Sequence, residues 1–597
     1  MENLKWMGRR IAVLFLAASV ASAFQQAKRS DKDHPPPAPN RIAEADRFDR
    51  DQTPRLPGAT GTAPEIVNFV DEHIFGAAKK AGIALAPLAG DLEFLRRVSL
   101  DLTGHLPTPE RIREFAADQT PGKRARLIDD LLDTSTKGVT AKPSTPFLDK
   151  WTYFLADLFR INNLQGKGQT LFYQHIRNSL LLDQPYDEFV REILTASARS
   201  NHNNAPVNFF LRYYIDQPDQ SMVNHEDSFD EFAIRTTRVF LGINLECVSC
   251  HDGKGHLEQV NSWLTERKRV ELWRQAAFFA KMRIYRPYGD MVDEFIVSDD
   301  GKGYDLAGKS VVRPPRYTAD ATPAFLLTGE RPRPGEEPRA AYARMLTAHP
   351  QFARATVNLV WAEMFGAGLV DPPLDWDLNR TPRHAALLDA LARDFAAHRY
   401  SVRHIVRLLA NSAAYRLSQS YPGEWKPEHA GFFARRLIRR LPAEQIWDAI
   451  SDATGVPESL PIGTTGLKAK YVQQTVSSTD LPEKLFAALS SFGLDDRTFS
   501  ARSLAFTPVQ SSILINSELV KAKVKADAGG RLAMLAKAEP PKKNAEIVEE
   551  LFLAALARFP SAREVTWGTA ILAEHHERGA EDILWALLNK AEFQLSY

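Results

Sequence analysis

Both cysteines of this 597-residue chain lie in one pentapeptide, Cys247-Val248-Ser249-Cys250-His251. The sequence constrains this stretch more than any other, because Cys-x-x-Cys-His is the attachment signature of a c-type haem. In such a site the two cysteines form thioether bonds to the porphyrin, and the histidine ligates the iron from the proximal side. The pattern therefore predicts Cys247 and Cys250 as haem anchors and His251 as the proximal ligand.

Other interpretations of the pentapeptide remain open. In an oxidising compartment the two thiols could pair as a disulfide, and a Cys-x-x-Cys pair can also act as a redox-active dithiol. A zinc ion could instead bind Cys247, Cys250 and His251 with a fourth ligand from Asp252, His256 or His225. The pattern could also stand in a chain that binds no cofactor.

The ligand opposite His251 would decide what a haem can do here. A methionine in that position raises the potential of the iron, whereas an open position permits oxygen or peroxide to bind. The candidates are His225, His256, Met282 and Met291, with His202 in a polar loop. A methionine beside Phe278 and Phe279 also fits a hydrophobic core. Trp263 and Trp273 could line a haem pocket, but they equally fit a helical core.

The N-terminal residues predict export. Residues 1–23 combine a basic start, an apolar stretch at 11–20 and an Ala-Ser-Ala cleavage site, the pattern of a secretory signal peptide. That stretch is shorter than the about 20 residues needed to cross a membrane, and we expect no membrane span in the mature chain. Residues 24–62 are rich in proline and charge, which predicts a disordered linker. We expect the mature protein in the periplasm or outside the cell.

Apolar residues spaced three and four apart predict a mainly α-helical fold. A first helical domain is expected over residues 63–290, where Phe94, Leu95, Val98 and Leu102 form one buried stripe. The tripeptide Thr108-Pro109-Glu110 predicts a helix start, with a capping residue, a proline and an acid in the first turn. Another helix, over about 228–244, should end close to Cys247.

A second helical domain is expected over residues 339–597, with helices at 387–395, 405–411, 443–453 and 545–557. A connector at 291–338, rich in proline and arginine, joins the two domains. Within it, segments 294–298 and 304–306 flank a turn at 299–303, which predicts a β-hairpin. Residues 455–480 carry little helical signal and are predicted to form a surface loop.

The charge balance of the chain excludes nucleic acid as a partner. The chain has 75 Lys and Arg against 74 Asp and Glu, a net charge of +1, so it lacks the excess positive charge that draws proteins to nucleic acid. The run of Arg435, Arg436, Arg439 and Arg440 is predicted to be the solvated face of a helix. The zinc-protease, nucleophile-elbow and P-loop patterns do not occur in the sequence, so no reaction is indicated.

Several motifs resemble a pair of known domain families. The segment 94–104 with Leu106-Pro107-Thr108 resembles the opening of domain of unknown function 1549, also called the planctomycete cytochrome-c-like domain. Segments 183–190 and 240–252 resemble its later motifs. Segments 357–361, 365–370 and 441–445 resemble domain of unknown function 1553, its usual companion. Family members often continue the pentapeptide with Asp-His-Pro, whereas here the next histidine is displaced to His256, so its role as a ligand does not carry over.

This resemblance implies an exported, cytochrome-like protein and carries no reaction with it. We therefore expect two helical domains joined by a small segment containing a β-hairpin. The first would carry one haem c and serve extracytoplasmic electron transfer or redox chemistry with an extracytoplasmic redox partner. The alternative is a haem-free binding or scaffold component of a surface polymer-handling system, with the pentapeptide as a disulfide or metal clip. The resemblance implies degradative proteins as its partners. Whether the chain is an enzyme stays open.

Overall fold

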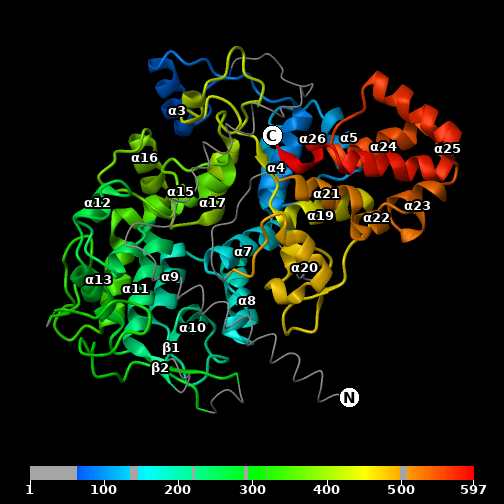
Figure 1. Ribbon diagram of the computed structural model, residues 1–597. Helices are drawn as coiled ribbons and strands as arrows, with labels where there is room; N and C mark the ends of the chain where they lie inside the picture. Colours follow the sequence, from blue (N-terminus) through cyan, green and yellow to red (C-terminus); the bar gives the residue numbers. More distant parts are fainter. Residues whose placement is uncertain (1–63, 135–144, 218–221, 288–292, 319, 498–506) are drawn as a thin grey trace, which may run out of the picture. The chain divides into compact units, whose positions relative to one another are not determined.

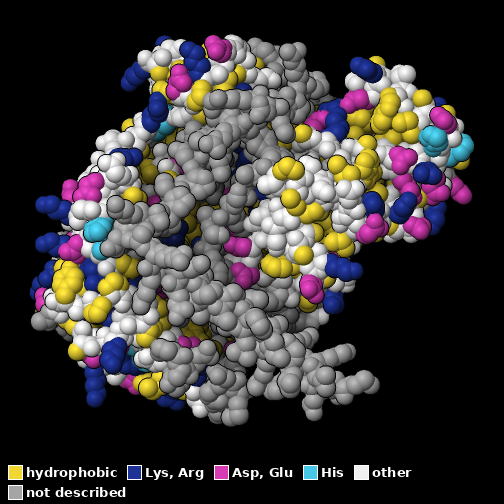
Figure 2. All heavy atoms as spheres, viewed as in Figure 1, with side chains coloured by type: hydrophobic (Ala, Val, Ile, Leu, Met, Phe, Trp, Pro, Cys, Tyr) yellow, Lys and Arg dark blue, Asp and Glu magenta, His cyan; other side chains and the backbone are white. Residues whose placement is uncertain are grey.

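The computed structural model describes residues 64–134, 145–217, 222–287, 293–318, 320–497 and 507–597. All of them belong to one compact unit, Pro39–Tyr597. The predicted signal peptide, the linker at 24–62 and Met291 lie outside the described residues. Within those residues, no helix combines the length and apolar character needed to cross a bilayer. Figure 2 shows basic and acidic side chains mixed over the visible face, in keeping with the balanced charge.

The fold is mainly α-helical, as predicted (Figure 1). Its first part contains α3 (Phe69–Lys80), α4 (Asp91–Thr103), α5 (Pro109–Ala117), α6 (Lys123–Leu132), α7 (Pro146–Leu158), α8 (Gly168–Leu181), α9 (Tyr186–Thr195), α10 (Asn208–Leu211), α11 (His225–Leu241), α12 (Ser262–Thr265) and α13 (Arg269–Ala276). Short 3-10 turns are η1 (Asn163–Gln165), η2 (Ala205–Val207), η3 (Cys247–Ser249) and η4 (Ala277–Phe279).

The second part contains α14 (Pro338–Ala348), α15 (Pro350–Phe365), α16 (Ala385–Ala397), α17 (Val402–Asn411), α18 (Pro427–Ala430), α19 (Ala443–Thr454), α20 (Glu483–Ser490), α21 (Pro508–Asn516), α22 (Glu518–Lys523), α23 (Arg531–Ala536), α24 (Asn544–Leu556), α25 (Ala562–Leu588) and α26 (Ala591–Gln594). Its 3-10 turns are η6 (Val472–Gln474), η7 (Ser478–Asp480) and η8 (Ala526–Ala528). The four helices predicted here correspond to α16, α17, α19 and α24.

Local capping explains where two of these helices begin. The hydroxyl of Thr108 accepts a hydrogen bond from the Arg111 amide, and the predicted α5 starts at the following proline. Helix α11 begins three residues earlier than predicted, because the side chain of Asn224 caps its first turn. It ends at Gly242, which adopts the left-handed conformation with φ 72°. The pentapeptide therefore follows the helix on a separate turn.

The described strands form two-stranded antiparallel pairs. These are β1 (Ile215–Asp216) with β2 (Val223–Asn224), β3 (Arg283–Tyr285) with β4 (Ile296–Ser298), β5 (Arg439–Arg440) with β8 (Leu595–Ser596), and β6 (Leu460–Pro461) with β7 (Lys468–Ala469). The predicted hairpin forms only in part. Its first strand corresponds to β4, but β4 pairs with the preceding strand β3 and not with residues 304–306. Tyr304 instead donates a hydrogen bond from its hydroxyl to the buried Asp230 at 2.6 Å, which turns that segment inward.

The hydrophobic core crosses the expected border at residue 338. One large cluster of buried side chains runs from Val70 to Leu437 and beyond, and a second is formed mainly by residues after 441. Helix α4 contributes to both, with the predicted stripe of Phe94, Leu95, Val98 and Leu102 in the first cluster and Leu100 in the second. The N-terminal part is thus packed directly against the C-terminal part.

Two further predictions need correction. The arginine run is not helical and is not solvated: Arg436 and Arg440 are buried, because Arg436 pairs with the buried carboxylate of Asp101 and Arg440 donates to the carbonyl of Phe492. The segment 455–480 is not simply a surface loop, since it contains β6, β7 and two 3-10 turns. Its Val472 is fully buried and donates its amide to Asp448, which fixes the segment against α19.

Candidate functional site

The pentapeptide forms a single turn at the surface. Cys247 begins η3, the amide of Cys250 donates to the Cys247 carbonyl at 3.2 Å, and the amide of Ser249 donates to Leu245. Cys247 is half-buried against the large hydrophobic cluster, whereas Cys250 is exposed. Both thiols are free. One turn thus presents the two predicted anchors and, directly after them, the half-buried His251.

The imidazole of His251 is oriented by the backbone. Its Nδ1 lies 3.1 Å from the carbonyl oxygen of Asp252. A carbonyl can only accept, so Nδ1 carries the proton and the lone pair of a neutral ring lies on Nε2. Metal-bound histidines are typically held in this way, by a carbonyl or carboxylate on the nitrogen that does not bind the metal.

The loop after the pentapeptide is fixed by hydrogen bonds of the Asp252 carboxylate and of the Arg269 side chain. Asp252 accepts from the Arg269 amide at 2.9 Å and from the Tyr317 hydroxyl at 2.7 Å. Burial acts to raise the pKa of Asp252, but these hydrogen bonds outweigh it and hold the pKa below its usual value. The guanidinium of Arg269 donates to the Ser249 carbonyl and lies 4.8 Å from the centre of the Trp273 ring.

A close backbone approach completes this support. A Cβ at Gly253 would lie 1.9 Å from the carbonyl oxygen of Leu264, so only glycine fits there. Trp263 and Trp273 are buried beside this segment, as expected of core residues. The turn that presents the pentapeptide is therefore fixed by hydrogen bonds and packing.

The electrostatics of Cys247 bear on the alternatives. Burial, assisted by the negative charges of Asp375 and Glu246, raises the pKa of the Cys247 thiol to about 11. The thiolate is the form that binds zinc and that attacks a disulfide. Zinc binding or disulfide exchange at Cys247 therefore requires the thiol to lose its proton, and a bound cation supplies the charge that removes it.

The structure places His225 and Met282, two candidates for a second iron ligand, in different surroundings. His225 begins α11, whose 17 residues span about 25 Å and end before the pentapeptide. Its Nε2 accepts from the Ile284 amide, and burial together with Arg283 lowers its pKa to about 4. Met282 is fully buried in the hydrophobic core. His225 is thus held at the end of α11 remote from the pentapeptide, whereas Met282 belongs to the cluster against which Cys247 packs.

His256 is the candidate that the fold does bring to His251. Their ring centres are 4.4 Å apart with the planes tilted by 36°. Two imidazoles on opposite sides of one metal, each bound at about 2 Å, would have ring centres about 6 Å apart. His256 therefore lies beside His251 and not opposite it.

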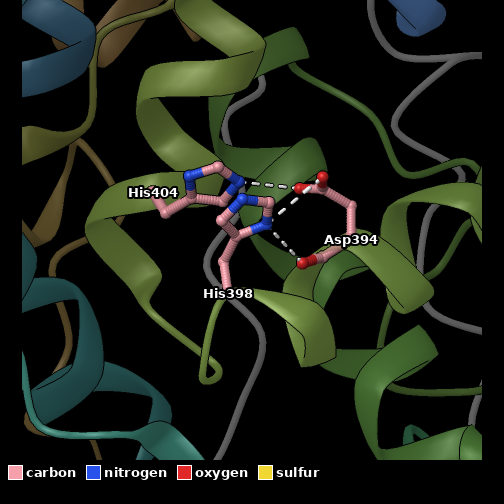
Figure 3. A group of neighbouring side chains, drawn as sticks. All are labelled: Asp394, His398 and His404. Atoms are coloured by element: carbon pink, nitrogen blue, oxygen red, sulfur yellow. Dashed lines mark hydrogen bonds and ion pairs between the residues drawn. The ribbon is translucent and has the colours of Figure 1, made fainter.

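Only one group of described residues brings three potential metal ligands within 4.8 Å of one another: Asp394, His398 and His404 (Figure 3). The pentapeptide does not belong to it. The sequence pattern did not single out these residues. The signal that could have found two of them is the spacing of Asp394 and His398, four apart on one helical face, but His404 joins them only through the turn that follows.

The residues of the pentapeptide fit a c-type haem. Two free thiols three residues apart would hold it, and His251 would offer Nε2 to the iron while Nδ1 stays on the Asp252 carbonyl. The sequence prediction of these three residues as a site is thus geometrically consistent, and it stays a prediction.

Comparison with known proteins finds two family matches. Residues 69–284 match PSCyt2, a protein of unknown function (DUF1549), and residues 338–572 match PSD1, a protein of unknown function (DUF1553). The resemblance drawn from the motifs is thereby confirmed, in the same order along the chain. No curated protein and no solved structure matches the chain.

Proposed function

This protein belongs to the family in which a DUF1549 domain is followed by a DUF1553 domain, and we propose that it is an exported c-type haem protein acting in extracytoplasmic electron transfer or redox chemistry. The observation that carries the proposal is the geometry of the pentapeptide. Its thiols are free, one turn presents both of them, and Nδ1 of the adjacent His251 is held by a backbone carbonyl.

Each residue of the site has a separate task. Cys247 and Cys250 would hold the group covalently, each by addition of its S–H across a vinyl double bond, which loses no atom. His251 would offer Nε2 to the iron while Nδ1 keeps its proton on the Asp252 carbonyl. When bound, the haem supplies a one-electron couple. Asp252, fixed by Arg269 and Tyr317, keeps the loop in place.

The proposal assigns no second ligand to the iron, because Met282 belongs to the hydrophobic cluster that Cys247 contacts and Met291 lies outside the described residues. His225 is held at the far end of α11, Met282 is enclosed in the core, and His256 lies beside the proximal ring. An open position permits binding of small ligands at the iron. Added imidazole should therefore change the visible spectrum of the haem-loaded protein where that position is open, and leave it unchanged where a side chain of the chain occupies it.

The test is a pyridine haemochrome spectrum of the full chain, produced with its leader in cells that contain c-type maturation machinery. The parent should give a c-type α-band, and Cys247→Ser with Cys250→Ser should abolish it. Lys254→Ala, an exposed change on the same loop, is the matched control and should keep the band. Absence of the band in the exported, folded parent would refute the proposal and leave the haem-free alternative.

A further inference from the structure

A second group of metal-binding side chains lies at the corner between α16 and α17 (Figure 3). Asp394 is in the last turn of α16, His398 is the residue that ends this helix, and His404 is in the first turn of α17. Their ligand atoms all lie within 4.8 Å of one another. None of the three residues takes part in the haem site proposed above.

Both imidazoles are turned toward the same carboxylate (Figure 3). Nε2 of His404 is 2.7 Å from Oδ2 of Asp394, and Nδ1 of His398 is 3.4 Å from Oδ1. The two rings are stacked, with centres 3.7 Å apart and planes 14° from parallel. Two nitrogens and a carboxylate thus converge on one small region.

The corner that creates this convergence is unusually tight. Arg399 and Tyr400 both have positive φ, 55° and 51°, a conformation that residues other than glycine rarely adopt and that costs on the order of 1 kcal/mol or more each. The Tyr400 ring packs on Phe395 and Phe352, and the Ser401 hydroxyl donates to Asp183 at 2.9 Å. These contacts fix the turn, which His398 precedes and His404 follows along the chain.

The donor set identifies the class of cation. Imidazole nitrogens suit zinc and neighbouring transition metals, whereas magnesium and calcium prefer oxygen ligands alone. Tetrahedral zinc bound at 2.0–2.1 Å places its ligand atoms about 3.3 Å apart. Nε2 of His404 and Nδ1 of His398 lie 2.7 and 3.4 Å from the two different oxygens of Asp394, so a shared ion requires the stacked rings to rotate until both nitrogens point at it.

The exposure of the site determines its fourth ligand. His398 is exposed, and Asp394 and His404 are partly exposed, so water has access. Zinc sites with three protein ligands keep an open position for water, unlike closed structural sites with four. We propose that Asp394, His398 and His404 form a zinc site whose fourth ligand is water.

Binding at this site involves a proton. Nδ1 of His398 lies 2.9 Å from the backbone carbonyl of Asp394, and because a carbonyl only accepts, this nitrogen carries a proton in the metal-free chain. Zinc can bind Nδ1 only in the tautomer that carries the proton on Nε2, so the ring proton moves from one nitrogen to the other and the neutral imidazole releases none to the buffer. The proton on Nδ1 returns when the metal is removed.

The experiment is calorimetric titration of the folded full chain with zinc chloride. The parent should bind zinc, and His398→Ala and Asp394→Asn should each lose one zinc equivalent or weaken its binding at least tenfold. His575→Ala, an exposed histidine on α25, is the matched control and should change nothing. Circular dichroism establishes that each variant is folded.

The cysteines require a separate comparison. Cys247→Ser with Cys250→Ser should keep the zinc equivalent that His398→Ala loses, which distinguishes this site from the pentapeptide. Cobalt(II) added in place of zinc should give a visible d–d spectrum that disappears in the His398 variant. The proposal is overturned if the parent binds no zinc, or if folded His398→Ala and Asp394→Asn bind it as the parent does.

Discussion

Asp101 on α4 offers a sharp test of how the two family regions are joined. It is fully buried, and its carboxylate accepts from Arg436 at 2.8 Å, from Arg439 at 2.6 Å and from the Tyr415 hydroxyl at 2.8 Å. Burial acts to raise the pKa of Asp101, but the two arginines outweigh it and hold the pKa below its usual value. The carboxylate is therefore charged in the folded protein.

Replacing Asp101 by alanine leaves two guanidinium groups without their counter-charge. The side chains of Arg436 and Arg439 are 2% and 10% exposed, so water cannot compensate for the loss. Removing one partner of a buried ion pair costs about 3–5 kcal/mol of folding free energy. We expect a decrease of that size in Asp101→Ala, and a smaller one in Asp101→Asn, which keeps the shape and one acceptor.

The assay is urea denaturation of the full chain, followed by circular dichroism and by tryptophan fluorescence. Asp129→Ala is the matched control, because the Asp129–Arg407 pair is 47% and 56% exposed and contributes at most about 1 kcal/mol. Because Asp101 lies in the first matched region and its arginines in the second, both regions should lose stability together. An effect of Asp101→Ala no larger than that of Asp129→Ala would refute the reasoning.

Further predictions concern pH, thiol reactivity and the iron ligands. Burial alone would lower the pKa of His105, but Asp452, 3.1 Å from its Nδ1, raises it from 6.5 to about 9. Because the folded protein holds this proton more tightly, the stabilisation is complete below pH 6.5 and is lost as the pH rises through 9. Denaturation series should show a decrease of at most about 3 kcal/mol, absent in His105→Gln, and a flat profile in the parent would contradict this origin. In the haem-free chain, iodoacetamide should modify the exposed Cys250 before Cys247, whose thiol has a pKa raised to about 11, and equal rates by peptide mass spectrometry would argue against the burial described. His256→Ala should leave the visible spectrum of the haem protein unchanged, since its ring lies beside that of His251, and a shifted spectrum would identify His256 as a ligand.

The helices of this fold were readable from the sequence because their determinants are local. The apolar stripe of α4 and the Thr108 cap of α5 each depend on residues within one or two turns. The partner of β4 was not readable, because a strand of three residues carries little pairing information and its real partner lies upstream. The segment 304–306 forms no strand, and its Tyr304 donates a hydrogen bond from the hydroxyl to the buried Asp230 instead.

The arginine run shows why charge patterns mislead when tertiary contacts decide. The spacing of Arg435, Arg436, Arg439 and Arg440 fits a helix face, and an exposed face is the usual outcome. Here Asp101, more than 300 residues earlier, supplies the counter-charge that permits burial. A pairing over that separation has no local signature in the sequence.

The pentapeptide and the group around Asp394 also differ in whether local sequence is enough to find them. The pentapeptide is contiguous, so its three residues were found from the sequence, although the position of His256 beside His251 needed the structure. The group of Asp394, His398 and His404 depends on two consecutive residues with positive φ, Arg399 and Tyr400. Neither is glycine or asparagine, so the sequence gives no sign that the chain reverses there.

The intact mass of the exported full chain, measured under denaturing conditions after removal of non-covalent ligands, tests the central claim most directly. Addition of both thiols to the porphyrin predicts a mass increase of one whole haem, localised to the peptide that contains Cys247 and Cys250. A chain of unmodified mass, or one lighter by two hydrogens because Cys247 and Cys250 have formed a disulfide, would contradict it.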